Sequence, residues 1–422
     1  MQKFLIKGSS SKGVQGLIRC SGAKNAVLPL MASSILFDNT VTLKNVPLGA
    51  NDVQTMIVLL KSLGSKVQIL KKKKILKINN KKKHKLLVKY QYISTMRAGV
   101  LAMGALLGKY KKCSTALSGG CSLGPRPIGY HLEGFRRLSC KYSLSKGYIN
   151  ILAKNGIKGG YYNFPKVSVT GTSNLILASV LANGITTLKN ISIEPEVLDL
   201  IKFLRNGGAK IYSKGKRTLK IYGVDKLNGH EHEVIGDRIE AFSYLCTAAI
   251  TKGSIKIEKI NPKHLRAELK VLRNIGCNIK VCKSSIELNR KSKLKPAKIK
   301  TAPFPGFATD CMPMLMAVLT KADGKSKIEE TIFSNRYMSA PELIRMGAKI
   351  NIKRSIAIII GKEKLNGAEC ISSDLRSTFA IILGAMTANG KSTISRVYHG
   401  LRGYSNLYNN LKKIGVNIKK KS

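Results

Sequence analysis

Apolar and polar positions along the chain follow a pattern that returns about every 70 residues. In each period an amphipathic helix ends at a glycine, which can adopt the left-handed conformation that closes a helix, and a strand follows that opens with an apolar, mostly β-branched residue. The shared glycines are Gly64, Gly208, Gly276, Gly347 and Gly415, and Ser139 stands where a sixth glycine is expected. The pattern therefore predicts six repeats.

Each period also contains a second helix that is apolar nearly all round, which is typical of a buried helix. These helices are expected at 26–36, 98–107, 175–182, 241–250, 312–319 and 378–386. A short alternating strand follows each of them, as at 40–43 and 254–257. Each repeat is thus a buried helix, a strand, a surface helix and further strands. Because six such repeats contain more residues than one hydrophobic core holds, we expect two domains of three repeats each.

Composition favours a cytoplasmic protein. With 44% hydrophobic residues the chain can bury a large core. No apolar run approaches the ~18 residues of a membrane span, and the first residues lack the apolar stretch of a signal peptide. The nine cysteines are odd in number and scattered without paired spacing, which fits a reducing compartment better than a disulfide framework.

The net charge of +52, from 74 Lys and Arg against 22 Asp and Glu, raises the possibility of nucleic-acid binding. Aromatic residues make up only 6% of the chain, however, and none interleave with the basic residues as a stacking motif would require. The densest lysine runs, 71–74 and 81–83, flank a predicted strand at 75–78 and are interpreted as a solvated hairpin edge. We therefore expect no specific nucleic-acid partner, although such a surface would attract small anions.

Two other kinds of site find little support. The six histidines are dispersed, and His230-Glu231-His232 is interpreted as a solvated loop rather than a metal site. Neither of the common glycine-rich phosphate-binding motifs follows a predicted strand.

The residues at the starts of the buried helices are more informative. They are Lys24, Arg97, Ser168, Arg238, Asp310 and Arg376. A helix N-terminus carries free N–H groups and partial positive charge, so it attracts anions. Ordinary capping is the alternative, and it accounts for Asp237 and Asp374. Capping does not explain why basic residues, which are unfavourable at an N-terminus, recur there. The pattern favours a polyanionic ligand held by several helix starts.

A glycine- and proline-rich loop at 117–127 presents Cys121 and Arg126 together. A thiol near basic groups has a lowered pKa and becomes a better acid or nucleophile. A lone loop cysteine is often incidental, so the loop alone leaves both interpretations open.

Several segments, in order along the chain, resemble the UDP-N-acetylglucosamine 1-carboxyvinyltransferases, the enolpyruvyl transferases of peptidoglycan synthesis. They are 21–30, 96–98, 119–127, 166–169, 194–196, 236–240, 301–305, 309–310, 334–338, 345–348, 374–376 and 402–404. The resemblance, from about residue 5 to 418, implies a two-domain inside-out α/β barrel with three repeats per domain. One domain would span 21–234 and carry the catalytic loop, and 1–20 plus 235–422 would form the other, with the active site in the cleft between them.

The resemblance also implies a reaction. Enolpyruvate would pass from phosphoenolpyruvate to the 3′-hydroxyl of UDP-N-acetylglucosamine with release of phosphate, the first committed step of peptidoglycan synthesis. Cys121 would be the proton donor and Asp310 the base, while Lys24, Arg126 and Arg402 would hold the phosphate and carboxylate. The implied UDP-sugar site comprises Asn25, Arg97, Arg126, Pro127, Ile128, Gly129, Tyr130, Lys166, Val167, Ser168, Val169, Asp310 and Ile332, and Arg376 is a further substrate contact. No metal or organic cofactor is implied.

Some positions depart from the family pattern. Pro125 would stiffen the loop, Thr170 replaces a glycine, and Leu401 replaces an acidic residue before Arg402. These changes are expected to alter substrate affinity more than activity.

The alternative within the same fold is enolpyruvylshikimate-phosphate synthase, which lacks a loop cysteine and begins with a different sequence signature. A degraded paralogue or a basic RNA-binding protein on the same repeats is the alternative from another class.

Overall fold

A computed structural model describes residues 2–8, 13–80, 84–117, 128–361 and 364–421. These residues form two compact units. Unit 1 comprises the described parts of Met1–Ser21 and Gly236–Ser422, and unit 2 those of Gly22–Gly120 and Pro125–Ile235. Each unit has its own hydrophobic core.

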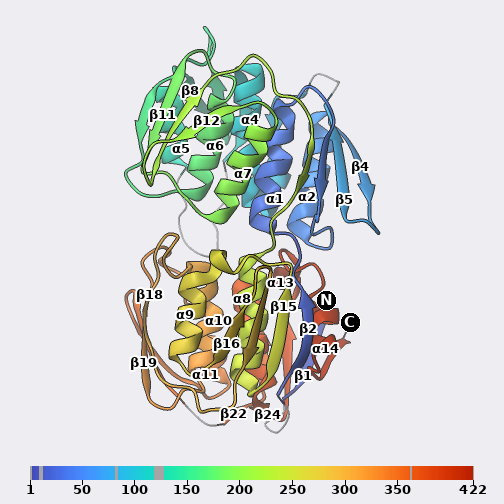
Figure 1. Ribbon diagram of the computed structural model, residues 1–422, viewed down its shortest axis with the longest axis vertical. Coiled ribbons are helices and arrows are strands. Elements are labelled where there is room, and N and C mark those ends of the chain that lie inside the picture. The colour runs from blue at the N-terminus through green and yellow to red at the C-terminus, as the bar shows by residue number, and fades with distance from the viewer. Residues whose placement is uncertain (1, 9–12, 81–83, 118–127, 362–363, 422) are drawn as a thin grey trace. The chain divides into compact units, whose positions relative to one another are not determined.

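Within each unit the sheets lie outside and helices fill the interior (Figure 1). The central helices are α1 (Lys24–Ser33), α4 (Leu101–Tyr110) and α6 (Val169–Ser179) in unit 2, and α8 (Arg238–Thr251), α10 (Met312–Leu319) and α12 (Leu375–Met386) in unit 1. The side chains of these helices are buried on nearly all sides. This is expected because the helices have no continuous polar face that would lie in water. The fold is the inside-out α/β architecture predicted from the sequence.

The six surface helices end where the repeats predict, five of them just before a shared glycine and the sixth just before Ser139. They are α2 (Asn51–Leu63), α5 (Gly129–Arg137), α7 (Pro195–Asn206), α9 (Arg266–Asn274), α11 (Ala340–Arg345) and α14 (Leu407–Lys413). The five shared glycines have φ between 89° and 116°, and Ser139 has φ of 65° in the same left-handed region. Ser139 therefore closes its helix as the glycines do, which confirms the sixth repeat. Shorter helical segments are η1 (Ser34–Leu36), α3 (Tyr90–Thr95), η2 (Arg97–Val100), η3 (Pro262–Leu265), η4 (Thr309–Cys311) and α13 (Tyr398–Leu401).

Each repeat has one four-stranded sheet, in which the first strand pairs parallel to the second and the others pair antiparallel. In unit 2 the orders are β14 (Glu231–Glu233), β3 (Val41–Lys44), β5 (Ile75–Asn79), β4 (Lys66–Leu70); β6 (Leu87–Val88), β7 (Lys112–Ala116), β9 (Tyr148–Leu152), β8 (Lys141–Ser145); and β10 (Tyr161–Asn163), β11 (Ile185–Lys189), β13 (Thr218–Tyr222), β12 (Lys210–Ser213).

In unit 1 the orders are β2 (Gln15–Arg19), β15 (Ser254–Glu258), β17 (Ser285–Asn289), β16 (Asn278–Val281); β18 (Lys298–Lys300), β19 (Lys325–Glu329), β21 (Ile356–Ile360), β20 (Lys349–Lys353); and β23 (Glu369–Ile371), β25 (Lys391–Ser395), β1 (Lys3–Lys7), β26 (Ile418–Lys421). The short strands β22 (Leu365–Asn366) and β24 (Ala388–Asn389) pair with each other.

Three strands, β1, β2 and β14, pair with strands of a repeat other than the one they precede in the chain. In four repeats the parallel edge strand pairs within the unit that holds the buried helix following it, but β2 and β14 are exchanged. The strand β2 precedes α1 yet pairs with β15 of unit 1, and β14 precedes α8 yet pairs with β3 of unit 2. The last sheet lacks a third strand from its own repeat, and β1 occupies that place between β25 and β26. The N-terminal segment therefore completes unit 1.

Two local predictions were wrong. The third buried helix was expected at 175–182 but spans Val169–Ser179, directly after the expected start residue Ser168. Its first turns hold polar residues: Ser173 Oγ donates to Val169 O within the helix and Asn174 Nδ2 donates to Val100 O of η2, each over 3.0 Å. The segment 230–232 is not a solvated loop. Its His232 lies in β14, is buried, and has Nε2 3.0 Å from Asp199 Oδ1.

Candidate functional site

All six expected residues lie at starts of buried helices. Lys24 and Arg238 are first residues of α1 and α8, Arg376 is the second of α12, and Ser168 is the N-cap of α6. Arg97 and Asp310 lie in the short helices η2 and η4 that lead into α4 and α10. Asp237 and Asp374 accept hydrogen bonds from backbone N–H groups of the first turns, which confirms their capping role.

In unit 1 the Asp310 carboxylate is held between two buried guanidinium groups. Arg376 donates to Asp310 Oδ2 from Nη2 over 2.9 Å and from Nε over 3.2 Å, and Arg336 Nη2 donates to Oδ1. The arginine side chains are only 4% and 1% exposed, whereas that of Asp310 is 28% exposed. Two positively charged guanidinium groups at this distance favour the ionised form of the carboxylate. The unit thus presents a fixed, accessible anionic acceptor.

Arg376 is itself stabilised as a cation. Burial opposes its charge, but the facing Asp310 outweighs burial, so the pKa of Arg376 is raised above its usual value. Its guanidinium also lies 5.5 Å from the ring centre of Tyr404, whose Oη is 2.7 Å from Ser243 Oγ on α8. The starts of α8, α10 and α12 are thereby joined in one polar cluster.

A further buried carboxylate, Glu330, supports the Asp310 segment. Its Oε2 accepts from Thr309 Oγ1 over 3.0 Å, and its Oε1 accepts from the backbone N–H groups of Ile332 and Phe333 over 2.8 and 3.1 Å. Arg336 Nε donates to Thr309 O over 3.0 Å. Glu330 therefore links the segment before α10 to the one that carries Ile332, a residue proposed to contact the sugar.

Arg402 lies at the end of α13. Burial, and then the charge of Arg402, lower the pKa of the nearby His399, and Asp374 also acts on this imidazole. Arg402 is therefore close to the start of α12. Arg238, at the start of α8, is buried and packs over the ring of Phe304 at 5.6 Å.

In unit 2 the Lys24 ammonium pairs with Asp52 at 3.1 Å, with both side chains largely buried. Asp52 is on the first turn of α2, so this ion pair joins the starts of α1 and α2. Asn25 follows Lys24 and is partly exposed.

Arg97 lies near a buried, neutral histidine. Burial and then the charge of Arg97 lower the pKa of His131 to about 4. The His131 ring is 2.8 Å from Asn174 Nδ2 and 3.5 Å from Thr170 Oγ1, so it bridges the starts of α5 and α6. The departure at Thr170 thus adds a hydroxyl that reaches this imidazole.

The other expected contacts of unit 2 are at helix starts. Ile128 is the N-cap of α5, and Gly129 and Tyr130 are its first residues. Apart from its chain neighbours and its own helix backbone, no atom of the described residues lies within 4 Å of the place where a Cβ on Gly129 would be. Ser168 Oγ accepts from Gly171 N over 3.1 Å, and Lys166, Val167 and Val169 flank it with at least partial exposure. Cys121, Arg126 and Pro127 lie outside the described residues.

The EPSP synthase (3-phosphoshikimate 1-carboxyvinyltransferase) family model matches residues 9–411. The chain is 44% identical over 420 residues to UDP-N-acetylglucosamine 1-carboxyvinyltransferase of Pelagibacter ubique (strain HTCC1062), covering 100% of both chains. It is 40% identical to the protein of the same name from Endomicrobium trichonymphae, with 99% of each chain covered. The chain belongs to the UDP-N-acetylglucosamine 1-carboxyvinyltransferase family.

Solved structures share the fold of this family member at lower identity. The enolpyruvyl transferase NikO from Streptomyces tendae aligns with a TM-score of 0.89 at 19% identity, covering 100% of this chain and 99% of that one. EPSP synthase from Acinetobacter baumannii aligns with a TM-score of 0.78 at 19% identity over 100% of both chains.

Arg336 and Glu330 were missed as site residues. Arg336 does fall within a segment that carried the family resemblance, but its contact with Asp310 joins residues 26 positions apart in sequence, and no local pattern reports such a contact. Glu330 directly follows a strand and stands next to a second glutamate, Glu329, and acidic residues in such a place are usually solvated.

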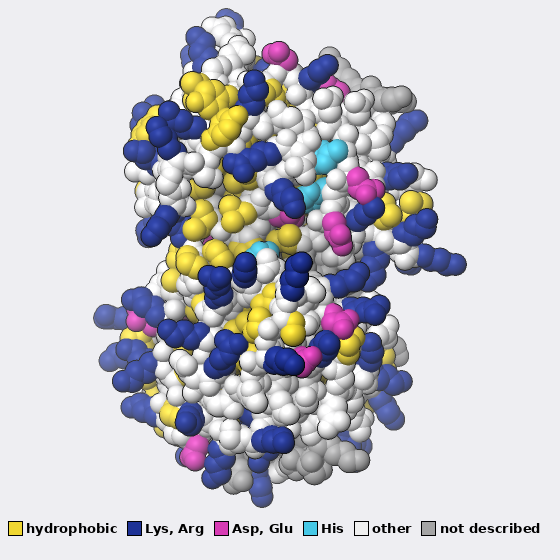
Figure 2. Space-filling model, viewed as in Figure 1, with side chains coloured by type: hydrophobic (Ala, Val, Ile, Leu, Met, Phe, Trp, Pro, Cys, Tyr) yellow, Lys and Arg dark blue, Asp and Glu magenta, His cyan; other side chains and the backbone are white. Residues whose placement is uncertain are grey.

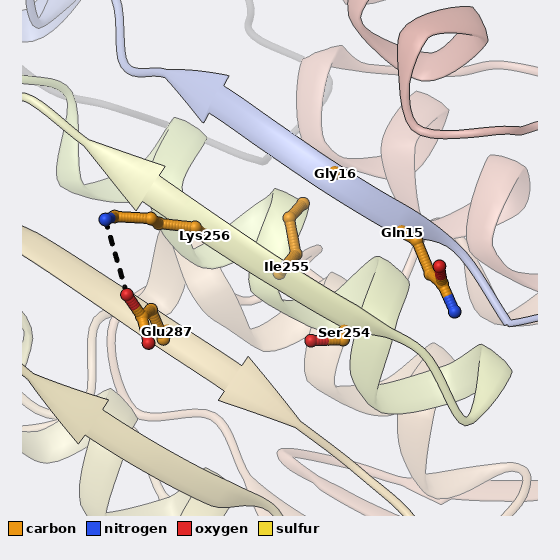
Figure 3. Close-up of a pocket in the computed structure, with 6 residues that line it drawn as sticks. All are labelled: Gln15, Gly16, Ser254, Ile255, Lys256 and Glu287. Carbon is orange, nitrogen blue, oxygen red and sulfur yellow. Dashed lines mark ion pairs between the residues drawn. The ribbon is translucent and has the colours of Figure 1, made fainter.

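Other potential sites lie elsewhere. A groove of about 460 Å³ on the sheet of β2, β15 and β17 is lined by Gln15, Gly16, Ser254, Ile255, Lys256 and Glu287, with Lys256 and Glu287 paired at 3.4 Å (Figure 3). A second, of about 900 Å³, is lined by Thr40, Thr42, Gly64, Lys66, Val67, Gln68, Lys77 and Asn79. Neither includes a residue of the expected site.

Among the described residues, no three His, Cys, Asp or Glu side chains form a group that could hold a metal ion. The eight described cysteines are free, and Cys282 is the one of them that is exposed. Within the described part of the chain, no helix is long and apolar enough to cross a membrane. Lys and Arg side chains are spread over the visible faces of both units, with few acidic ones between them (Figure 2).

Proposed function

We propose that the protein transfers enolpyruvate from phosphoenolpyruvate to the 3′-hydroxyl of UDP-N-acetylglucosamine and releases phosphate. Two relatives named UDP-N-acetylglucosamine 1-carboxyvinyltransferase match the whole chain at 40% and 44% identity, which supports this reaction. The structural observation that carries the proposal is the Asp310 carboxylate, fixed by Arg336 and Arg376 yet partly open to solvent.

Asp310 has the role of the base. The sugar hydroxyl must lose its proton as its oxygen bonds to the central carbon of phosphoenolpyruvate, and a carboxylate within hydrogen-bond reach can accept that proton. The two arginines hold the ionised acceptor in one orientation, which removes the need to order it during the reaction.

Cys121 has the role of the acid, protonating the methylene carbon of phosphoenolpyruvate so that the neighbouring carbon becomes electrophilic. Lys24, Arg126 and Arg402 hold the phosphate and carboxylate of the same substrate, where their charges stabilise the developing anion. Arg376, which already holds Asp310, is also a substrate contact. Lys24 belongs to unit 2, and Arg376 and Arg402 belong to unit 1.

The UDP-sugar is held by groups that suit a diphosphate and a nucleoside. Arg97 and Lys166 supply positive charge, and the α5 and α6 starts supply backbone N–H donors at Gly129 and around Ser168. Ile332 lies on the segment that Glu330 holds beside Asp310. The remaining contacts are those expected from the sequence at Asn25, Pro127, Ile128, Tyr130, Val167 and Val169.

The test is phosphate release from phosphoenolpyruvate with different acceptors. We expect release with UDP-N-acetylglucosamine and none with shikimate 3-phosphate. The second acceptor is the one that the matching family model describes, so release with shikimate 3-phosphate instead would overturn the assignment.

We place this reaction in the cytoplasm, as the first committed step of peptidoglycan synthesis, and hence in cell-wall biogenesis, cell shape and cell division. No metal, cofactor or specific nucleic-acid partner enters the proposal.

A further inference from the structure

The first turn of α8 departs from the pattern that its sequence predicts. Asp237 and Glu240 are spaced as a capping box, in which the carboxylate three residues after the N-cap bonds back to the N-cap's own N–H. Asp237 does cap the helix, accepting from the N–H groups of Ile239 and Glu240 over 2.9 and 3.0 Å. Its own N–H, however, donates to Ser21 O over 2.9 Å. Glu240 is thus left to bond elsewhere.

Glu240 bonds to the same residue, Ser21. Its Oε2 accepts from Ser21 N over 2.7 Å and its Oε1 accepts from Ser21 Oγ over 3.3 Å, while Cys20 Sγ lies 3.6 Å from Oε2. Both backbone groups and the hydroxyl of Ser21 are therefore held by two residues of α8. We call Asp237, Glu240 and Ser21 the Ser21 clamp.

The clamp holds the point at which the chain leaves unit 1. Ser21 is the last residue of that stretch and Gly22 the first of unit 2. A Cβ on Gly22 would lie 1.9 Å from Asn45 O, so the backbone passes tightly there, and Ala23 N donates to Ile235 O over 2.7 Å. The next residue, Lys24, begins α1. Only Gly22 and Ala23, each held by a close contact, separate the clamped Ser21 from Lys24.

We propose that Glu240 is a positioning residue for enolpyruvyl transfer: by holding Ser21 it sets the placement of Lys24, without touching a substrate. The inference rests on the proposed function, because Lys24 matters to turnover only if it binds phosphoenolpyruvate. A displacement of about 1 Å at a group that orients a reactant can cost up to about a hundredfold in rate.

The burial of Glu240 supports a specific role. It is 2% exposed, and a buried carboxylate is costly unless its bonds are made. Burial, and then Asp237, raise the pKa of Glu240 to about 7. A neutral amide can make both Ser21 bonds, with Oε1 accepting from the N–H and Nε2 donating to Oγ, so glutamine is the conservative replacement.

The experiment compares Glu240→Gln, Glu240→Leu and Arg290→Met. Arg290 is the matched control: it is also buried and charged, and it bonds to main-chain groups at the other end of α8, donating to Ile250 O over 3.3 Å and to Ser292 O over 2.6 Å. Each variant is assayed for kcat/KM with phosphoenolpyruvate at saturating UDP-N-acetylglucosamine. Amide hydrogen exchange at Ser21 and the thermal midpoint are measured alongside.

We expect Glu240→Leu to lower kcat/KM about tenfold or more and to speed exchange at Ser21. Glu240→Gln should keep kcat/KM within about threefold and keep Ser21 protected. Arg290→Met should lower the thermal midpoint without changing kcat/KM beyond that range. Equal kinetic losses in Glu240→Leu and Arg290→Met, or unchanged kcat/KM in Glu240→Leu, would overturn the proposal. If the unaltered protein releases no phosphate, the proposed function fails and the kinetic role of Glu240 fails with it, whereas the exchange data still decide whether the clamp exists.

Discussion

The two units have the same architecture, but the starts of their buried helices differ in chemistry. In unit 1 the basic residues converge on one acid, with Arg336 and Arg376 both bonded to Asp310. In unit 2 they have separate surroundings: Lys24 pairs with Asp52, and Arg97 lies near a neutral His131. The two sets of helix starts are therefore not copies of one site.

Under the proposed function, this difference gives the two units different tasks. The buried helices give each unit a ring of N–H donors and partial positive charge, which suits phosphates in either unit. Unit 1 adds an oriented carboxylate, which suits proton transfer from a hydroxyl. Unit 2 adds separate charges and helix caps, which suit the binding of an anionic ligand.

The largest expected effect comes from alkylation of the loop. A small anionic epoxide of the fosfomycin type should modify Cys121 and abolish turnover, because basic neighbours such as Lys24 and Arg126 would favour the thiolate. Modification should be faster with UDP-N-acetylglucosamine present. Peptide mass mapping and residual activity measure both effects.

Cys282 is the built-in control for that experiment, because it is the exposed one among the described cysteines and should react much more slowly. Burial raises the pKa of other thiols, as at Cys113, and makes them poorer targets. Cys121→Asp should retain activity and escape alkylation. If Cys282 is modified first, or if the UDP-sugar protects Cys121, the loop is not the site of the acid.

The next effect tests the carboxylate of unit 1. Asp310→Asn should lower kcat about a hundredfold or more, the contribution of a general base, while UDP-sugar binding persists. The control is Asp199→Asn, a buried acid of unit 2 beside His232, which should cost stability and leave kcat unchanged. Near-normal turnover of Asp310→Asn would reduce this residue to an ion-pair partner of the two arginines.

A smaller effect tests the charge of unit 2. Lys24→Met should raise KM for phosphoenolpyruvate roughly tenfold to a hundredfold, because a phosphate or carboxylate loses its cation. The change also leaves Asp52 without this partner, at a cost of about 1–3 kcal/mol. Lys24→Met/Asp52→Asn should recover that stability but not the affinity. If the double variant recovers both, Lys24 acts through Asp52 and not on the substrate.

The repeats could be predicted from the sequence because helix ends and apolar periodicity are local signals. Even Ser139 could be placed, since the spacing marked its position before its φ of 65° was known. The full range of α6 could not, although Ser168 marked its start, because Ser173 and Asn174 are poor helix formers and the bond from Asn174 to Val100 O joins residues 74 positions apart. Arg336 and the partners of Glu240 depend on contacts distant in sequence, which no local pattern contains.

The pH dependence of stability tests the Ser21 clamp, whose residues all lie in unit 1. The pKa of Glu240 is about 7 against an ordinary 4.5, so its stabilising contribution is fully present below pH 4.5 and is lost as the pH rises through 7. The other titratable groups that face it are Asp237, Cys20 and Tyr244. Glu240→Gln cannot ionise, so its stability relative to the unaltered protein should grow between pH 5 and pH 8, by up to about 3 kcal/mol. Denaturant titrations at the two pH values measure it, and a constant difference would show that Glu240 is ionised throughout.

The smallest expected effect on turnover concerns the outer lysines. The helix-start charges are paired or buried, whereas the surface lysines of both units lie in solvent (Figure 2), where salt screens them. Mixed-sequence RNA should therefore bind without sequence preference and lose affinity steeply as salt rises from about 50 to 200 mM, through release of counterions. Over the same range kcat/KM for UDP-N-acetylglucosamine should change only a few-fold, because substrate meets the fixed charges of the helix starts. A defined RNA that stays bound at physiological salt would instead mean that the basic surface is itself a site, and it would revive the RNA-binding alternative.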